Sequence, residues 1–236
     1  MYTKTAKLYD ALYGFKDYAA AANEIFAVIR RHNPEATTLL DAACGTGRHL
    51  AHLRRSFAAE GLDINPELLD IARRRCPGTT FYEVDMVDFE LGKRFDDITC
   101  LFSSIAYVRT LRNMRAAVAA MVRHLNPRGI LLIEPWFTPE SCRVNHITTN
   151  FVDEPDLKIA WMYVNRAVDR LSVLDIDYLV GSPAGVQHFT ERHELGLFAH
   201  AEYLDALRDA GLNACHDPVG PFGRGLYVGL TGPARS

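Results

Sequence analysis

Apolar positions recur along the chain with two different periods, and they predict helices and strands that alternate. A spacing of three and four residues predicts amphipathic helices over residues 19–31, 48–57, 67–75, 111–125 and 201–210. Short apolar runs predict strands over residues 37–41, 60–64, 80–84, 97–102, 129–134, 213–216 and 225–230. Strands that alternate with helices in this way predict an α/β fold with a mostly parallel seven-stranded sheet, covered on both faces.

The pattern changes after Pro139. Four runs of alternating apolar and polar residues follow, separated by segments typical of turns, at residues 145–152, 159–168, 171–180 and 186–198. They predict an antiparallel sheet inserted into the α/β fold. We therefore expect a core formed by residues 1–137 and 199–236. We expect residues 138–198 to form an insertion that caps a substrate, pairs two subunits into a homodimer, or does both.

Composition and charge narrow the class of protein. The 236 residues are 48% hydrophobic and 23% charged, as in a globular protein, and the net charge of −3 argues against a nucleic-acid partner. Five scattered cysteines, with no C-x-x-C pair, suggest neither a disulfide framework nor a zinc ribbon. The sequence has no signal-peptide pattern and no run of 18 apolar residues, so we expect a cytoplasmic protein without a membrane partner.

Small residues follow the first predicted strand. The segment from Leu39 to Gly47 reads L-L-D-A-A-C-G-T-G, and such a turn lets a ligand approach backbone N–H groups closely. A dinucleotide motif, counted from Gly45, would need glycine where Leu50 stands, which argues against NAD. The turn predicts a site for a ligand the size of a nucleoside.

Acidic residues mark the ends of the neighbouring strands. Asp63 follows Asp41 by 22 residues, at a place from which a carboxylate can accept both hydroxyl protons of a ribose. Asp85 and Met86 can supply an acceptor for an adenine amino group and an apolar wall. A single glycine turn or strand-end aspartate often has only a structural role, but features at successive strand ends together predict a nucleoside site.

With these residues the chain resembles the class I S-adenosylmethionine-dependent methyltransferases. The glycine segment is similar to their first motif, Gly61-Leu62-Asp63 to their second, and Asp85-Met86 to their adenine contact; Ala43 stands where many members have glycine. The resemblance implies a Rossmann-like fold and S-adenosylmethionine as cofactor. It also implies a set of cofactor-binding residues: Tyr9, Tyr18, Asp41, Ala43, Gly45, Gly47, Asp63, Ile64, Asp85, Met86 and Phe102.

A narrower resemblance covers nearly the whole chain. The segments 1–18, 102–107, 134–137 and 223–226 are similar to those of bacterial TDP-3-amino-sugar N,N-dimethyltransferases of the desosamine and mycaminose type. This implies N-methylation, expected as N,N-dimethylation, of a TDP-amino-deoxysugar in antibiotic sugar biosynthesis. It places Tyr9 and Tyr18 at the methionine part of the cofactor. It implies substrate-binding residues Tyr2, Ser103, Tyr107, Trp136, Phe137 and Arg224, with Tyr2 and Tyr107 beside the amine as the catalytic pair and Arg224 at the nucleotide.

For this reaction we expect positioning to dominate. Orienting two reactants can lower a barrier by roughly 7–11 kcal/mol, whereas a general base contributes about 10²–10⁴-fold. We therefore expect Tyr2 and Tyr107 to orient the amine, with base catalysis secondary.

Several alternatives stay open at this stage. The tyrosines could be packing residues, Arg224 could form an ordinary salt bridge, and Cys44 is expected to be a buried filler. A shared metal at His188 and His193 is not expected, because residues five apart on a strand face opposite sides. Methylation of nucleic-acid bases or of protein arginine lacks its motifs in residues 102–105. A small-molecule O-methyltransferase and a non-catalytic nucleotide-sugar or cofactor-binding module remain as alternatives.

Overall fold

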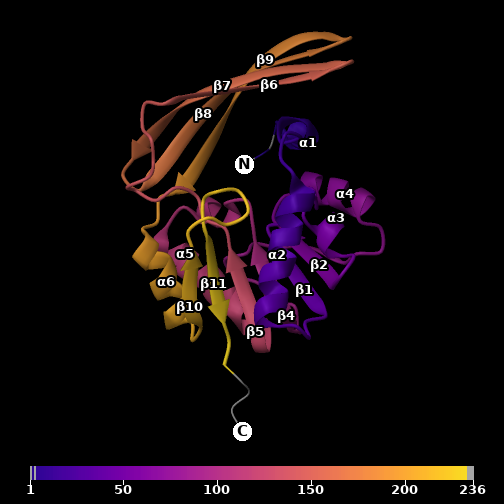
Figure 1. The fold of residues 1–236 in the computed structure, drawn as a ribbon. Coiled ribbons are helices and arrows are strands. Elements are labelled where there is room, and N and C mark those ends of the chain that lie inside the picture. Colours follow the sequence, from indigo (N-terminus) through magenta and orange to yellow (C-terminus); the bar gives the residue numbers. More distant parts are fainter. Residues whose placement is uncertain (1, 3, 233–236) are drawn as a thin grey trace.

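The computed structural model describes residue 2 and residues 4–232, and it consists of a helix-covered sheet with a second sheet above it (Figure 1). Residues 1, 3 and 233–236, which the sequence analysis assigns to the core, lie outside the described residues. The chain builds most of the lower sheet, forms the upper sheet between residues 147 and 196, and returns to complete the lower one. The predicted α/β fold and the inserted antiparallel sheet are confirmed.

The lower sheet has seven strands in the order β10-β11-β5-β4-β1-β2-β3. From β5 to β3 all neighbours are parallel, while β11 runs antiparallel to both β5 and β10. The strands are β1 (Thr38–Ala42), β2 (Ala58–Asp63), β3 (Phe81–Glu83), β4 (Phe95–Cys100), β5 (Leu125–Ile133), β10 (Asn213–Asp217) and β11 (Leu226–Leu230). The parallel strands end at one edge, where open α/β sheets bind ligands.

Helices bury both faces of this sheet. Leu39 of β1 packs in a cluster with α2 (Tyr18–His32) and α3 (Leu50–Leu53), and the next residue, Leu40, packs with α5 (Leu111–Arg123) and α6 (His200–Asp209). Successive side chains of a strand point to opposite faces, so a strand buried on both faces needs a continuous apolar run. Helix α4 (Pro66–Arg75) contacts β2 and β3 near the edge of the sheet.

Local signals explain most helix ends, with one difference. The Asn65 side chain accepts two N–H hydrogen bonds from the first turn of α4, and Pro66 is the first residue of that helix, as predicted. Gly211, with φ +92°, follows the end of α6. The predicted helix over residues 48–57 is shorter, because only Leu50–Leu53 is α-helical. Several flanking amides bond three residues back rather than four, as in tighter turns.

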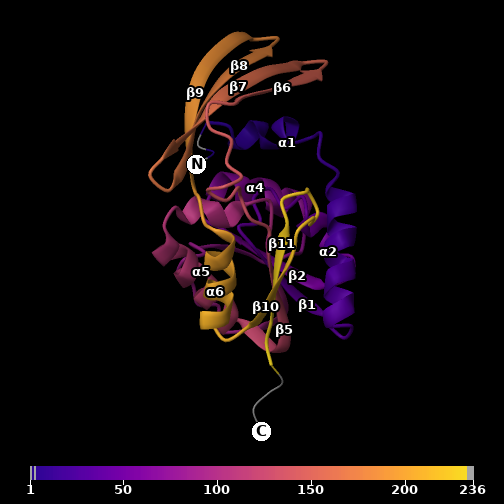
Figure 2. The ribbon, with the colours of Figure 1, turned by 60° about the vertical axis from the view of Figure 1, so that its left-hand side comes forward.

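The upper sheet consists of four antiparallel strands in sequence order: β6 (Ile147–Glu154), β7 (Leu157–Val168), β8 (Leu171–Ser182) and β9 (Gly185–Gly196). Trp161, Ile176 and Leu195 belong to a buried cluster on one face of this sheet. The N-terminal helices η1 (Ala6–Leu8) and α1 (Tyr9–Leu12) lie beneath the sheet (Figure 2). The short 3-10 helix η2 (Ser104–Val108), which follows β4, contacts β9. The space between the two sheets is thus closed by segments from three parts of the chain.

Within the described part of the chain, no helix has the length and apolar character needed to cross a bilayer.

Candidate active site

The turn after β1 leaves space for a ligand at the edge of the lower sheet. Gly45 has φ +55°, and a Cβ added there would meet nothing within 4 Å. Gly47 has φ +73°, and a Cβ added there would lie 3.2 Å from the Cβ of Ala72 in α4. Ala43 also has a positive φ, of 57°, which costs a non-glycine residue on the order of 1–2 kcal/mol. Gly45 therefore allows ligand access, whereas Gly47 allows close packing of a helix.

Two buried carboxylates lie beside this turn. Asp63, at the end of β2, accepts 2.8 Å hydrogen bonds from the backbone N–H groups of Gly45 and Asn65. Burial raises the pKa of Asp63, and these N–H groups only partly offset the rise. Asp41 in β1 accepts a 2.8 Å hydrogen bond from the hydroxyl of Thr99, and burial raises its pKa to about 7. Asp63 and the turn thus form one hydrogen-bonded unit, and Asp41 is held beside it by Thr99.

A cavity of about 490 Å³ lies next to this unit. It is lined by seven of the residues predicted to bind the cofactor: Tyr9, Ala43, Gly45, Asp63, Ile64, Asp85 and Met86. Met86 is buried and apolar, while Asp85 is exposed. A nucleoside needs this combination of an apolar wall for its base and carboxylates for its hydroxyl and amino groups.

An adjoining cavity of about 330 Å³ shares Tyr9, Ala43 and Gly45 and adds Tyr18, Asp41 and Phe102. The Tyr18 hydroxyl is buried and has no hydrogen-bond partner among the described residues. The guanidinium of Arg48, which also lines this cavity, lies 4.4 Å from the centre of the Tyr18 ring. The Tyr18 hydroxyl and the Arg48 guanidinium match the carboxylate of an amino acid, and the Asp41 carboxylate matches its ammonium group. The residues present therefore fit S-adenosylmethionine, which has a nucleoside end and an amino-acid end.

A third cavity, of about 840 Å³, lies between the lower sheet and the upper sheet. Its lining includes five of the predicted substrate-binding residues: Tyr2, Ser103, Tyr107, Trp136 and Arg224. The sixth, Phe137, packs edge-on against Trp136 with ring centres 4.7 Å apart and does not line the cavity. The indole N–H groups of Trp136 and Trp161, which both line the cavity, are buried and have no partner among the described residues.

Two cations share this third cavity. Arg224 donates a 2.6 Å hydrogen bond to the Ser103 hydroxyl, and its guanidinium lies 5.1 Å from the centre of the Trp136 ring. Burial, together with the charge of Arg224, lowers the pKa of Lys16 to about 8. One oxygen of the buried Glu134 accepts the N–H of Phe102 and the other has no partner in the described chain. An anionic ligand would relieve the repulsion between the two cations.

The loop that carries these groups is strained. Phe102 and Ser103, two consecutive non-glycine residues, have φ values of 55° and 61°, and Arg109 after η2 has a φ of 64°. Such backbone conformations cost about 1–3 kcal/mol each and tend to occur at functional sites. Here they orient η2, which carries Tyr107.

Tyrosine hydroxyls lie where the first and third cavities meet. Tyr2 and Tyr107 line both, and their hydroxyl oxygens are 3.1 Å apart. Tyr2 also lies 3.3 Å from the hydroxyl of Tyr13, and Tyr107 lies 2.9 Å from Nδ1 of His193. Burial raises the pKa of Tyr2 and of Tyr107 well above the usual tyrosine range, so both are protonated at neutral pH. They act as hydrogen-bonding groups and not as phenolate bases.

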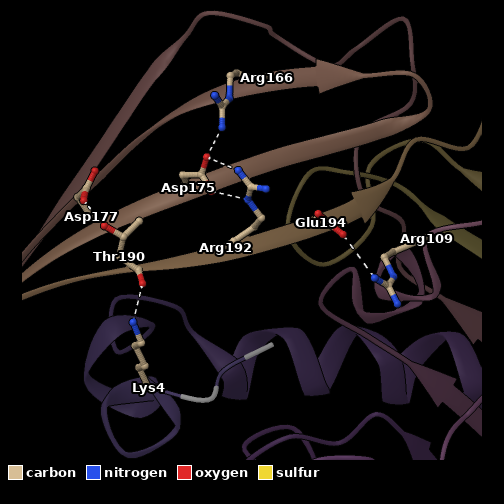
Figure 3. A network of polar contacts seen from close by, with 8 residues as sticks. All are labelled: Lys4, Arg109, Arg166, Asp175, Asp177, Thr190, Arg192 and Glu194. Atoms are coloured by element: carbon tan, nitrogen blue, oxygen red, sulfur yellow. Dashed lines mark hydrogen bonds and ion pairs between the residues drawn. The ribbon is translucent and has the colours of Figure 1, made fainter.

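Strand β9 ties the segments that carry these tyrosines to the upper sheet. The Lys4 ammonium donates to the carbonyl of Thr190 at 3.1 Å, and Arg109 pairs with Glu194 at 3.4 Å (Figure 3). The first contact holds the N-terminal segment and the second holds η2. The upper sheet thereby fixes the relative positions of Tyr2 and Tyr107.

Several lining residues were not predicted from the sequence. They are Lys16, Arg48, Trp161 and His193. His193 is buried and the exposed His188 faces the other side of β9, as strand periodicity predicts. Among the described residues, no three His, Cys, Asp or Glu side chains gather as metal ligands.

Comparison with known proteins adds independent information. Residues 39–129 match the model of a family described as "Methyltransferase domain". The chain is 38% identical over 231 residues to the dTDP-3-amino-3,6-dideoxy-alpha-D-glucopyranose N,N-dimethyltransferase of Streptomyces fradiae, which covers 96% of this chain and 91% of that protein. It is 39% identical to the dTDP-4-amino-2,3,4,6-tetradeoxy-D-glucose N,N-dimethyltransferase of Saccharopolyspora spinosa, covering 95% of this chain and 92% of the relative.

The fold gives the same result. The crystal structure of DesVI from Streptomyces venezuelae superimposes with a TM-score of 0.92 at 37% identity, covering 97% of this chain and 99% of that one. The similarity thus includes the inserted upper sheet as well as the lower one. Both the cofactor and the enzyme class expected from the resemblance are confirmed: the chain is an enzyme that uses S-adenosylmethionine as methyl donor. It belongs to the class I S-adenosylmethionine-dependent methyltransferases, in the family of the sugar N,N-dimethyltransferases.

Proposed function

We propose that this enzyme N,N-dimethylates the amino group of a dTDP-linked amino-deoxysugar in antibiotic sugar biosynthesis. The observation that carries the proposal is the junction at Tyr2 and Tyr107, where a cavity suited to S-adenosylmethionine meets a larger one suited to a nucleotide sugar. Relatives named for 3-amino and for 4-amino sugars are both 38–39% identical to the chain. The position of the amine is therefore a question for experiment.

The cations of the larger cavity support a diphosphate-linked substrate. Lys16 and Arg224 both line it, and each is partly shielded from water. Arg224 also lies 5.8 Å from the ring centres of Phe102 and Phe137, so its charge is held among aromatic rings. We propose that these two residues bind the diphosphate and that the Trp136 region holds the nucleotide end.

The roles assigned to the cofactor site extend this proposal. Asp63 would accept the ribose hydroxyls, Asp85 and Met86 would hold the adenine, and Tyr18 with Arg48 would bind the carboxylate. We propose that Gly47 supports this site by its packing on α4 and makes no direct ligand contact.

The proposed mechanism depends on how the chain positions the amine relative to the methyl group of the cofactor. Bound S-adenosylmethionine supplies a methyl group made electrophilic by a sulfonium. The chain has to hold a neutral amine in line with that methyl group and keep water away, and correct orientation alone can lower the barrier by about 7–11 kcal/mol. Tyr2 and Tyr107 hold protonated hydroxyl groups at the junction of the cavities, and their oxygens can accept N–H hydrogen bonds from the amine. We propose that they orient the amine, with general-base catalysis secondary.

A panel of substrates tests the function. The purified enzyme would be incubated with S-adenosylmethionine and dTDP-3-amino and dTDP-4-amino sugars, and the products analysed by mass spectrometry. We expect a gain of two methyl groups on at least one sugar. O-methylation would instead modify amine-free dTDP sugars, and tight binding without transfer would show a binding module; either result would overturn the proposal.

We further propose that residues 138–198 cap the substrate and that the enzyme is a homodimer. The face of the upper sheet turned away from the cavity exposes apolar side chains at Ile147, Phe151, Met162, Val164 and Leu179. Charged residues on β8 and β9 border them, with Asp175 paired to Arg166 and Arg192 (Figure 3). An apolar patch with a charged rim is typical of a self-complementary interface.

The proposed dimer is tested by comparing the oligomeric states of wild type and Met162→Glu by analytical ultracentrifugation. We expect a dimer that the substitution converts to an active monomer. A monomeric wild type contradicts the proposal.

All five cysteines are free in the structure, which supports the proposal of a reducing, cytoplasmic location.

A further inference from the structure

A buried pair on β9 stands behind the tyrosines of the active site. His193 is almost fully enclosed, with Nδ1 2.9 Å from the Tyr107 hydroxyl and Nε2 3.8 Å from a carboxylate oxygen of Glu191. Glu191 in turn accepts hydrogen bonds from the Thr5 hydroxyl and, at 3.1 Å, from the backbone N–H of Lys4. Polar groups therefore follow one another from the cavity junction through Tyr107 and His193 to Glu191. The Tyr107–His193 step is within hydrogen-bond distance, whereas Nε2 faces Glu191 at an ion-pair distance and has no hydrogen-bond partner among the described residues.

The charge of Glu191 determines the direction in which a proton would move along these groups. Burial alone would raise the pKa of Glu191, but hydrogen bonds from Thr5 and Lys4, together with the nearby His193 imidazole, outweigh it and hold that pKa well below the usual range. The carboxylate is thus ionised at neutral pH. Because it faces Nε2, a neutral imidazole keeps its proton there and presents Nδ1 as an acceptor toward Tyr107. Tyr2 lies 4.8 Å from this ring, measured between ring centres. The other ionisable residues that line a cavity together with His193 are Tyr13, Lys16, Tyr163 and Arg224 on the substrate side and Asp85, Arg109, Arg192 and Glu194 in a neighbouring cleft.

Dimethylation creates a need for such a path. In the first transfer the amine lone pair forms the new N–C bond, the C–S bond breaks with its electrons going to sulfur, and a secondary ammonium results. This ammonium has no lone pair, so it must lose a proton before the second transfer. Many aromatic rings line the substrate cavity, so few polar side chains there can accept the proton.

We propose that His193, backed by Glu191, takes this proton through Tyr107 and so allows the same bound amine to be methylated twice. In this structure the Tyr107 hydroxyl donates to Tyr2. For the transfer it turns that proton toward Nδ1 of His193, 2.9 Å away, and gives it up while its oxygen takes the ammonium proton. The substrate nitrogen regains its lone pair, and the positive charge moves to an imidazolium beside the Glu191 carboxylate. His193 acts through Tyr107 and is therefore a positioning residue.

The proton can leave by a different route from the substrate. His193 and Tyr107 also line a separate cleft of about 1050 Å³, which lies beside the cofactor cavity. The exposed Arg109 and the partly exposed Glu194 lie at this cleft. The imidazole thus lies between the substrate cavity and a cleft with solvent-exposed residues, which suits a group that must be discharged between two transfers.

The test counts methyl groups added during a single binding event. Enzyme loaded with the dTDP-amino sugar that it dimethylates best is mixed with S-adenosylmethionine and excess isotope-labelled sugar as a trap. We expect wild type to yield mostly dimethylated product. His193→Gln and Glu191→Gln should raise the ratio of monomethyl to dimethyl product at least about tenfold, below the 10²–10⁴-fold range of full general-base catalysis. That ratio should also become strongly dependent on pH and buffer concentration in the variants.

His188→Gln is the matched control, because His188 lies on the same strand with its side chain exposed on the opposite face, near Asp177. It should keep the wild-type ratio. Binding of S-adenosylhomocysteine, measured by calorimetry, confirms that each variant is folded. An unchanged product ratio and pH profile in a folded His193→Gln enzyme would overturn the proposal.

A second measurement does not need turnover. ¹⁵N NMR of the histidines in wild type should show His193 with its proton on Nε2 and an accepting Nδ1; a proton held permanently on Nδ1 would overturn the proposal. The inference rests on the proposed function, and the two fail differently. If wild type methylates no dTDP-amino sugar, the proposed function is wrong. If wild type dimethylates such a sugar and replacing His193 has no effect, only the proposed proton relay is wrong.

Discussion

The carboxylate of Asp63 accepts a 2.8 Å hydrogen bond from the backbone N–H of Gly45, so the acid at the end of β2 supports the turn at the end of β1. Parallel pairing of β1 and β2 brings the two strand ends together. The backbone of Gly45 can approach Asp63 because glycine has no Cβ and therefore adopts a φ of +55° without steric cost.

Replacing Asp63 by Asn should damage both the turn and the cofactor site. An amide offers one acceptor oxygen where the carboxylate offers two, so one of two buried N–H groups loses its partner, at a cost of about 1–3 kcal/mol of unfolding free energy. We expect at least a tenfold loss of affinity for S-adenosylhomocysteine by calorimetry, with a lower Tm. Asp70→Asn, an exposed change on α4, should alter neither quantity. Wild-type affinity in Asp63→Asn would contradict the assigned role.

Binding of the substrate diphosphate should weaken above pH 8. Burial and Arg224 lower the pKa of Lys16 to about 8, so its positive charge is lost as the pH rises through that value. A bound diphosphate needs that charge. Calorimetry with dTDP should therefore show tighter binding at pH 7 than at pH 9, and Lys16→Gln should bind about tenfold more weakly at pH 7 with little pH dependence. The exposed Lys7→Gln serves as control, and an equal pH dependence in Lys16→Gln would refute the assignment.

Tyr107→Phe should lower turnover modestly, by about tenfold, if positioning dominates. The substitution keeps the ring but removes the hydroxyl shared with Tyr2 and His193, leaving the buried Nδ1 without its polar partner. The loss of these two buried contacts, in one of which Tyr107 donates to Tyr2, should cost about 1–3 kcal/mol of stability. Single-turnover rates of the first methyl transfer, with substrate affinity measured alongside, check this. Complete loss of transfer with unchanged affinity would indicate an obligatory base.

Much of the site could be predicted because it depends on short-range patterns. Parallel strands that end at one edge bring Asp41, Asp63 and Asp85 together without any knowledge of side-chain packing. Lys16 and His193 could not be found in this way. Each belongs to a segment with an ordinary surface or strand pattern, and its role comes from contacts with residues more than 80 positions away, such as Phe102 and Tyr107. Only the fold of the upper sheet over the N-terminal segment creates those contacts.

Two adjacent aspartates at the far end of the sheet lead to a prediction on stability. In Asp96, burial is outweighed by hydrogen bonds from Thr37, Thr38 and Asn126, and the pKa falls to about 2. In Asp97, burial and repulsion by Asp96 raise the pKa to about 7, and neither carboxyl oxygen has a hydrogen-bond partner in the described chain.

Asp97→Asn should therefore stabilise the protein at pH 8. Between pH 4 and 7 the folded state binds the Asp97 proton while the unfolded state has released it, so this group makes stability fall as the pH rises through that window. An amide cannot ionise, and the substitution should remove that pH dependence and raise the free energy of unfolding at pH 8 by about 1–3 kcal/mol. Denaturant unfolding at pH 5 and pH 8 measures both effects. Asp96→Asn is the opposing control, because it weakens a well-bonded carboxylate and should destabilise at pH 8. A stability loss in Asp97→Asn that is equal at both pH values would show instead that the buried carboxylate is held by partners when ionised.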